Sequence, residues 1–137
     1  MYKKIMVPVD LAHIETLEKA ITTATDIAKL YQASVCFVGV TAETPTSVAH
    51  TPAEFAQKLE AYGAKEAAEH GLKFETAAYP SHDPTVDLDK TLIRAADENG
   101  ADLIVMASHM PGFAEHFFAS HAGDVASHAK ISVFVVR

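Results

Sequence analysis

Two apolar stretches decide the fold, Leu103-Ile104-Val105-Met106 and Val133-Phe134-Val135-Val136. Each is continuous in apolar side chains, which is typical of a parallel strand covered on both faces. Between them the sequence predicts a long loop and then a short helix over residues 119–129. In open α/β sheets, the loop that leaves a strand's carboxyl end and enters a helix is where anions bind. The last third of the chain therefore predicts a parallel sheet with a candidate anion site.

The rest of the chain continues the alternation of strands and helices. Further strands are expected at residues 5–9 and 35–40, with a half-exposed edge strand at 72–77. Apolar residues at helical spacing predict helices over residues 15–31, 52–70 and 87–99. The predicted fold class is α/β, a single-domain, doubly wound, five-stranded parallel sheet of order 3-2-1-4-5 with helices on both faces. It spans residues 1–137.

Start and stop signals frame the second and third helices. Thr51 can cap the second helix, Pro52 suits its first position, and Glu54 completes a capping box. Gly71 suits the residue that ends this helix, and Gly100 stops the third.

Composition excludes several classes of function. The net charge is −7, from 11 basic and 18 acidic residues, which argues against nucleic-acid binding because that binding relies on Lys and Arg. The apolar runs are too short to cross a bilayer, and the first residues do not resemble a secretory signal. The single Cys36 lies in an apolar run and has no disulfide partner in the sequence. We therefore expect a cytoplasmic protein without membrane insertion.

Asp10 is the first candidate functional residue, because it follows the first strand at the carboxyl edge of the sheet. Ligands bind there in doubly wound folds, where a carboxylate can accept ribose hydroxyls or hold a metal. Asp10 can equally cap the next helix, and the sequence leaves both interpretations open.

The second candidate is the segment from Met106 to His121. Ser120 can cap the last helix, which leaves the backbone N–H groups of His121 and Ala122 free to bind an anion. An ordinary capped helix is the alternative. Asp10 on the neighbouring strand favours the anion site.

Histidines cluster in this region, at His109, His116, His121 and His128. Their spacings of seven, five and seven residues do not suit a shared metal, so we expect surface histidines and no metal site. No Ser-His-Asp order or reactive cysteine stands out, and Asp10 and His109 are the remaining candidates for a general base. We therefore expect a protein that is not an enzyme, with slow nucleotide hydrolysis as the least favoured alternative.

Three segments resemble the universal stress protein family. They are Lys4-Ile5-Met6-Val7-Pro8-Val9-Asp10, Gly100-Ala101-Asp102-Leu103-Ile104-Val105-Met106, and the ending from Ser127 to Arg137. The resemblance covers the whole chain. ATP-binding members of the family carry G-x2-G-x9-G-[S/T] in the last third. Here Ala107, Met110 and Ala119 occupy the three glycine positions, Ser120 follows, and the spacer is one residue shorter.

The resemblance implies a site for an adenine nucleotide, ATP or AMP, with Mg²⁺ as a candidate ion. Adenine is expected near Val9 and Val40, and ribose at Asp10. The phosphates are expected at residues 107–110 and 119–121. The full set of expected contacts is Pro8, Val9, Asp10, Val40, Met106, Ala107, Ser108, His109, Met110, Ala119, Ser120 and His121.

The resemblance further implies a stress-response regulator or sensor that forms a homodimer through the last strand, residues 133–136. That strand is apolar until Arg137 and suits an edge that needs cover. The alternative is a protein-interaction module of the same fold that has lost nucleotide binding, because glycine is missing from all three positions of the motif.

Overall fold

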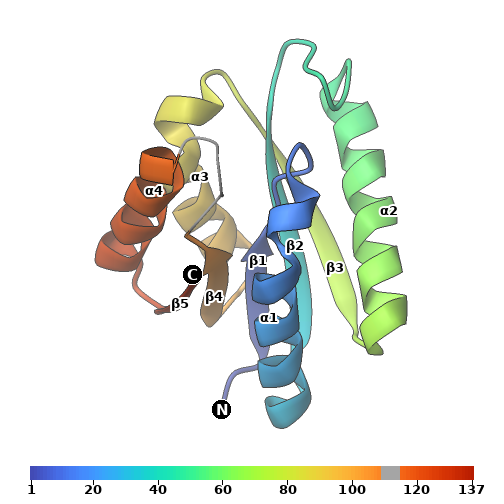
Figure 1. Ribbon diagram of the computed structural model, residues 1–137, viewed down its shortest axis with the longest axis vertical. Coiled ribbons are helices and arrows are strands. Elements are labelled where there is room, and N and C mark those ends of the chain that lie inside the picture. The colour runs from blue at the N-terminus through green and yellow to red at the C-terminus, as the bar shows by residue number, and fades with distance from the viewer. Residues whose placement is uncertain (109–114) are drawn as a thin grey trace.

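The structure is a computed structural model that describes residues 1–108 and 115–137; for residues 115–120 the description is confined to the backbone. In this part of the chain, five parallel strands form one sheet of order β3-β2-β1-β4-β5 (Figure 1). The strands are β1 (Lys4–Pro8), β2 (Ser34–Ala42), β3 (Phe74–Ser81), β4 (Leu103–Ala107) and β5 (Ser132–Val136). The predicted fold class and strand order are confirmed.

Helices cover both faces of the sheet, because each connection between parallel strands crosses over it. They are α1 (Glu18–Tyr31), α2 (Pro52–His70), α3 (Pro84–Glu98) and α4 (Glu115–His128), with a 3-10 turn, η1 (Ile14–Thr16), before α1. Among the described residues, no helix is long and apolar enough to span a membrane.

Two buried clusters lie on opposite faces of the sheet. On one face, Ile5 and Val7 of β1 pack with α1 and α2 residues such as Ile21 and Leu59. On the other face, Met6 of β1 belongs to the cluster that includes α3 and α4. Successive residues of β1 thus point to opposite faces, and both faces are apolar, which explains the continuous apolar runs of the central strands.

The caps predicted for α2 form with one difference. The Thr51 hydroxyl accepts a hydrogen bond from the Glu54 amide at 3.1 Å, and Pro52 occupies the first turn. The Glu54 carboxylate accepts from the amide of His50 at 3.0 Å rather than from the cap residue. Gly71 ends the helix at φ 67°, a conformation that glycine adopts without a Cβ penalty.

Two helices begin earlier than the sequence predicts. Helix α3 begins at Pro84 rather than residue 87, because the Asp83 side chain accepts from the amide of Val86 at 3.4 Å and caps the first turn. Helix α4 begins at Glu115, so Ser120 lies inside it. The prediction that Ser120 caps this helix is therefore wrong, and so is the expectation of free backbone amides beside it. Glu115 and Ala119 are good helix formers, and the helix begins before the serine signal.

Helices α3 and α4 are joined by a buried polar contact. Nδ1 of His121 on α4 is hydrogen-bonded to Oδ1 of Asp89 on α3, and His121 is only 7% exposed. The expectation that the clustered histidines are surface residues is therefore wrong for His121. The two partners lie 32 residues apart in the sequence, so no local pattern predicts that they form a pair.

Helix α2 approaches β2 closely at Gly39. A Cβ at this position would lie 2.7 Å from Cε1 of Phe55 and 3.2 Å from Cδ2 of Leu59. Real Cβ atoms do not come this near to a neighbour, so the distance between α2 and the sheet depends on a residue without a side chain.

Gly39→Ala is expected to destabilise the protein by about 1–3 kcal/mol, because the added methyl overpacks a closed interior. Gly123→Ala is the matched control, since a Cβ there meets nothing within 4 Å and alanine favours a helix. Urea unfolding followed by circular dichroism measures both. A Gly39→Ala variant as stable as the parent would show that α2 does not depend on this close approach.

Asp89→Ala is expected to lower the free energy of unfolding by about 1–3 kcal/mol, since it removes the carboxylate that Nδ1 of the buried His121 ring contacts. Asp97→Ala is the control, because Asp97 lies exposed on the same helix. Equal urea midpoints for the two variants would contradict a stabilising role for the contact between α3 and α4.

Candidate functional site

The candidate site lies at the carboxyl edge of the sheet, where β1 and β4 are neighbours. Ile5 pairs with Leu103 and Met6 with Ile104. After β1 the chain continues to α1 on one face, whereas after β4 it continues to α4 on the other (Figure 1). Divergence of the connections at adjacent strand ends opens a crevice in doubly wound folds. The fold therefore brings Pro8, Val9 and Asp10 to the same edge as Ala107 and Ser108.

Asp10 is held by its own loop. Its Oδ1 accepts a hydrogen bond from the amide of Ala12 at 3.0 Å, and its Oδ2 lies 2.9 Å from Nδ1 of His13. The Asp10 side chain is 30% exposed. A carboxylate oxygen can accept two hydrogen bonds, so Asp10 is fixed in position and keeps capacity for a donor from solvent or a ligand.

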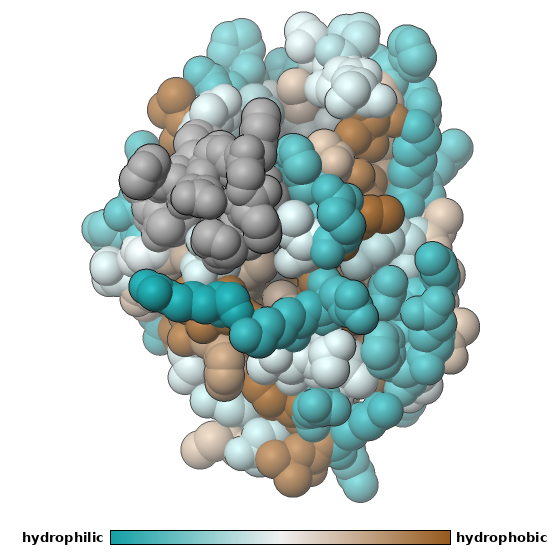
Figure 2. Space-filling model, in the orientation of Figure 1, coloured by the Kyte–Doolittle hydropathy of each residue, from teal (hydrophilic) through white to brown (hydrophobic). Residues whose placement is uncertain are grey.

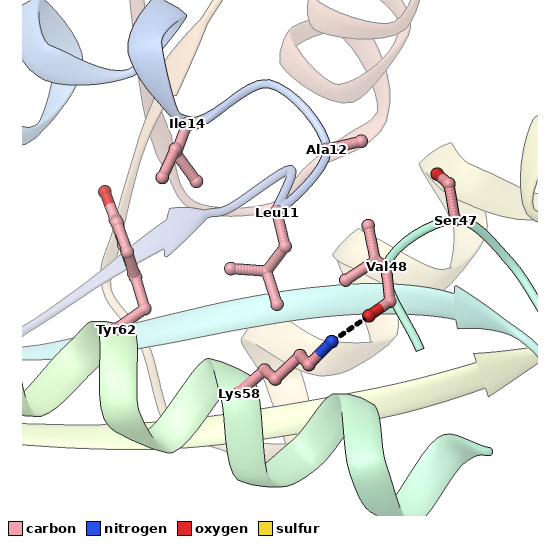
Figure 3. Close-up of a pocket in the computed structure, with 7 residues that line it drawn as sticks. All are labelled: Leu11, Ala12, Ile14, Ser47, Val48, Lys58 and Tyr62. Carbon is pink, nitrogen blue, oxygen red and sulfur yellow. Dashed lines mark hydrogen bonds between the residues drawn. The ribbon is translucent and has the colours of Figure 1, made fainter. Parts of the chain in front are cut away.

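A cavity of about 460 Å³ opens beside this loop (Figure 3). Residues from three segments line it, namely Leu11, Ala12 and Ile14 after β1, Ser47 and Val48 after β2, and Lys58 and Tyr62 on α2. In Figure 2 apolar atoms reach the surface between α2 and the segment after β1. Apolar residues thus make up four of the seven that line the cavity, and two of them, Leu11 and Ala12, directly follow Asp10 in the sequence.

Two polar side chains of the cavity, Lys58 and Tyr62, come from α2. Nζ of Lys58 donates a hydrogen bond to the carbonyl of Val48 and lies 3.3 Å from Oε1 of Glu54. Lys58 thereby ties the loop after β2 to α2 (Figure 3). The ring of Tyr62 packs edge-on against Phe37 at 6.0 Å. Burial is the main reason that the pKa of Tyr62 is raised, so its hydroxyl stays protonated at neutral pH and can donate.

On the β4 side of the crevice, the residues that the structure describes are engaged elsewhere. Both the amide and the hydroxyl of Ser108 donate to the carbonyl of Val136, at 2.9 and 3.3 Å. Met106 is 2% exposed and belongs to the core between the sheet and α3 and α4. Ser108 therefore links the end of β4 to β5, and the Met106 side chain lies in the core.

The remaining predicted residues are not all brought together. Val9 packs on the α1–α2 face, whereas Val40 packs on the α3–α4 face. His121 contacts Asp89 on the α3–α4 face. His109 and Met110 lie outside the described residues, and Ala119 and Ser120 are placed only as part of the backbone of α4.

His13, Lys58 and Tyr62 were not predicted from the sequence as residues of this region. A histidine three positions after an Asp that ends a strand is a usable signal for His13, since a loop Asp commonly binds groups two and three residues ahead. Lys58 and Tyr62 have no comparable signal, because the cavity depends on how α2 is placed against the loop after β1.

One group of described residues has the geometry of a cation site. Ligand atoms of Glu66, Glu69 and His70 lie within 4.8 Å of one another at the end of α2. Nε2 of His70 lies 3.5 Å from Oε2 of Glu66, an ion pair when the histidine is protonated. All three residues belong to one helix turn, and they lie at the opposite end of α2 from its start near the carboxyl edge.

Comparisons with known proteins agree with this architecture. Universal stress protein G of Shigella flexneri is 27% identical over 143 aligned positions, covering 100% of both chains. A universal stress protein solved in complex with cAMP superposes with a TM-score of 0.73 at 19% identity, over 99% of this chain and 97% of the other. A universal stress protein of Archaeoglobus fulgidus solved with dAMP gives 0.69 at 20% identity, over 99% and 98%. The model of the universal stress protein family matches residues 1–137, and this chain therefore belongs to that family.

Proposed function

We propose that this protein binds an adenine nucleotide at the carboxyl edge of β1. The observation that carries the proposal is the cavity of about 460 Å³ whose lining includes Leu11 and Ala12, the two residues that follow Asp10 in the sequence. The cavity is large enough for a purine base, and the neighbouring carboxylate suits a ribose hydroxyl. Relatives of the same fold were solved with cAMP and with dAMP, which supports this class of ligand.

Asp10 is the residue on which ribose binding depends in this proposal. Its contacts with Ala12 and His13 hold the carboxylate in one orientation before the ligand arrives. A positioned acceptor loses less conformational entropy on binding than a mobile one. Pro8, Val9 and Ala107 complete the expected surroundings at the strand ends.

Charge favours a monophosphate over a triphosphate. From Ala107 to Lys130 the sequence has one Lys or Arg, Lys130 itself. Among the residues that line the cavity, Lys58 is the only Lys or Arg, and its ammonium is already bound to Glu54 and Val48. A triphosphate would therefore depend on backbone amides and on an ion such as Mg²⁺ for charge compensation, whereas AMP needs less of it.

The second candidate function is a protein-interaction module without nucleotide binding. The hydrogen bonds of Ser108 to Val136 favour it, because they occupy groups at the first position after β4 that could otherwise face a phosphate. Alanine or methionine at the three glycine positions of the motif points the same way.

We further propose that the chain acts as one domain over residues 1–137, as a cytoplasmic regulator or sensor rather than an enzyme. The lone, fully buried Cys36 is compatible with a reducing compartment.

We also propose a homodimer through β5. This strand lies at an edge of the sheet, and Phe134 and Val135 are 48% and 37% exposed. Exposed apolar edge strands favour pairing with another chain.

Titration calorimetry with AMP and with ATP, each with and without Mg²⁺, tests the nucleotide proposal. AMP is expected to bind, and Asp10→Ala to weaken it about tenfold, the usual effect of losing a charged hydrogen-bond acceptor. Asp26→Ala is the control, because Asp26 is exposed on α1. Absence of heat and of a thermal shift at millimolar AMP and ATP would favour the interaction module instead.

Val135→Lys is expected to convert the dimer to a monomer, because a lysine on an edge strand opposes pairing. Sedimentation velocity measures the change. Val86→Lys is the matched control, since Val86 is 72% exposed on α3, away from β5. A parent protein that sediments as a monomer would refute the homodimer.

A further inference from the structure

A second cavity, of about 370 Å³, lies at the carboxyl end of β3 on the α3 side of the sheet. Its walls are the end of β3 and the first turns of α3, with Ser81, His82, Asp87, Lys90, Thr91 and Arg94 among the lining residues. Strand β2 separates β3 from β1. The first cavity is lined from α2, so the two cavities share the carboxyl edge but have no lining residue in common.

Ser81 is the unusual residue of this cavity. It is 94% buried, as its relative exposure is 6%, and its hydroxyl oxygen has no hydrogen-bond partner among the described residues. Buried polar groups are nearly always hydrogen-bonded, so an unsatisfied hydroxyl calls for an explanation. A ligand in the cavity that Ser81 lines provides one, because rotation about χ1 can turn the hydroxyl toward it.

The charges of the cavity favour an anion. Within the part of the chain that the structure describes, Lys90 forms no ion pair, and it lies on the same helix face as Arg94, four residues on. The Arg94 guanidinium stacks 5.4 Å from the centre of the Tyr79 ring, and its Nε lies 3.7 Å from Glu98. These contacts hold the guanidinium over the end of β3 with most of its donors available.

Acidic groups are also present near this cavity and bear on the choice of ligand. Asp87 lines it, and Nδ1 of His82 lies 3.8 Å from Oε2 of Glu43. Glu98 and Glu43 thus lie beside the lining residues Arg94 and His82, and within the lining Asp87 is one carboxylate beside the two fixed cations. The same carboxylate can accept a hydrogen bond from a ligand hydroxyl.

We propose that this second cavity binds the phosphate group of a small phosphorylated molecule. Lys90 and Arg94 hold the phosphate oxygens, and the hydroxyls of Ser81 and Thr91 donate to them. Arginine and lysine are the side chains that suit phosphate, through a planar fork and a compact charge respectively. Free phosphate and a phosphate ester share this chemistry, and Asp87 favours the ester when the ester carries hydroxyls.

Amide chemical shifts of the ¹⁵N-labelled protein during titration with inorganic phosphate, and separately with ribose 5-phosphate, test the proposal. Saturable shifts are expected at residues 80–94. If ribose 5-phosphate binds more tightly than inorganic phosphate, the ligand class is a phosphate ester. If the two bind equally, the ligand is free phosphate. Chemical-shift changes that grow linearly with phosphate concentration, and that sodium chloride reproduces at equal ionic strength, would overturn the proposal. Changes confined to residues 9–13 would overturn it as well.

Charge-removing variants sharpen the test. Lys90→Gln and Arg94→Gln are each expected to weaken binding about tenfold, in line with the loss of a charged donor. Lys65→Gln, an exposed lysine on α2, is the matched control and should bind as the parent does. Equal weakening in all three would indicate a general charge effect and would refute the site.

Ser81→Ala separates a binding role from a structural one. Because the hydroxyl lacks a described partner, its removal is expected to leave the urea midpoint unchanged or raised, while phosphate binding weakens. A lower midpoint with unchanged phosphate binding would show that the hydroxyl supports the fold and would overturn its role. None of these readouts depends on AMP binding at Asp10, so this proposal and the nucleotide proposal fail independently.

Discussion

Burial of β1 on both faces is the constraint on which the rest of the structure depends. Ile5, Met6 and Val7 are all 0% exposed, and β1 pairs with β2 on one side and β4 on the other. Parallel neighbours on both sides of β1 require crossover connections, and apolar side chains on both of its faces require helices over both. These connections diverge at a crossover point beside its carboxyl end. That point is where Asp10 emerges, so the position of the site follows from the core.

The two walls of the crevice differ in what they leave available. On the β1 side, local contacts fix Asp10 while its carboxylate keeps unused acceptor capacity. On the β4 side, the amide and the hydroxyl of Ser108 both donate to the carbonyl of Val136, which links the end of β4 to the edge strand β5. Of these two described groups, Asp10 is the one that keeps capacity for a further hydrogen bond, and residues 107–130 contain a single Lys or Arg, Lys130.

Much of the fold and part of the site could be predicted. Continuous apolar runs located the central strands, and Thr51 and Gly71 marked the ends of α2, because these signals act over a few residues. The start of α4 was predicted wrongly, because the Ser120 cap signal competes with a helix-forming segment before it. The pairing of His121 with Asp89 and the first cavity escaped prediction, because each joins residues from separate helices or loops. The second cavity depends on how α3 packs against the end of β3.

By itself the sequence determined the α/β class, the strand order, the family and the place of Asp10 at a strand end. The class and the place of Asp10 follow from hydrophobic periodicity, which is a property of neighbouring residues. The family follows from the resemblance of short motifs, and the strand order is the one expected of the doubly wound class. The tertiary structure alone decided which polar groups are occupied and which are available. Ser108 and His121 are bound internally, whereas the Ser81 hydroxyl lacks a partner among the described residues. The physical reason is that hydrogen-bond satisfaction depends on packing between elements, and residue order does not encode that packing locally.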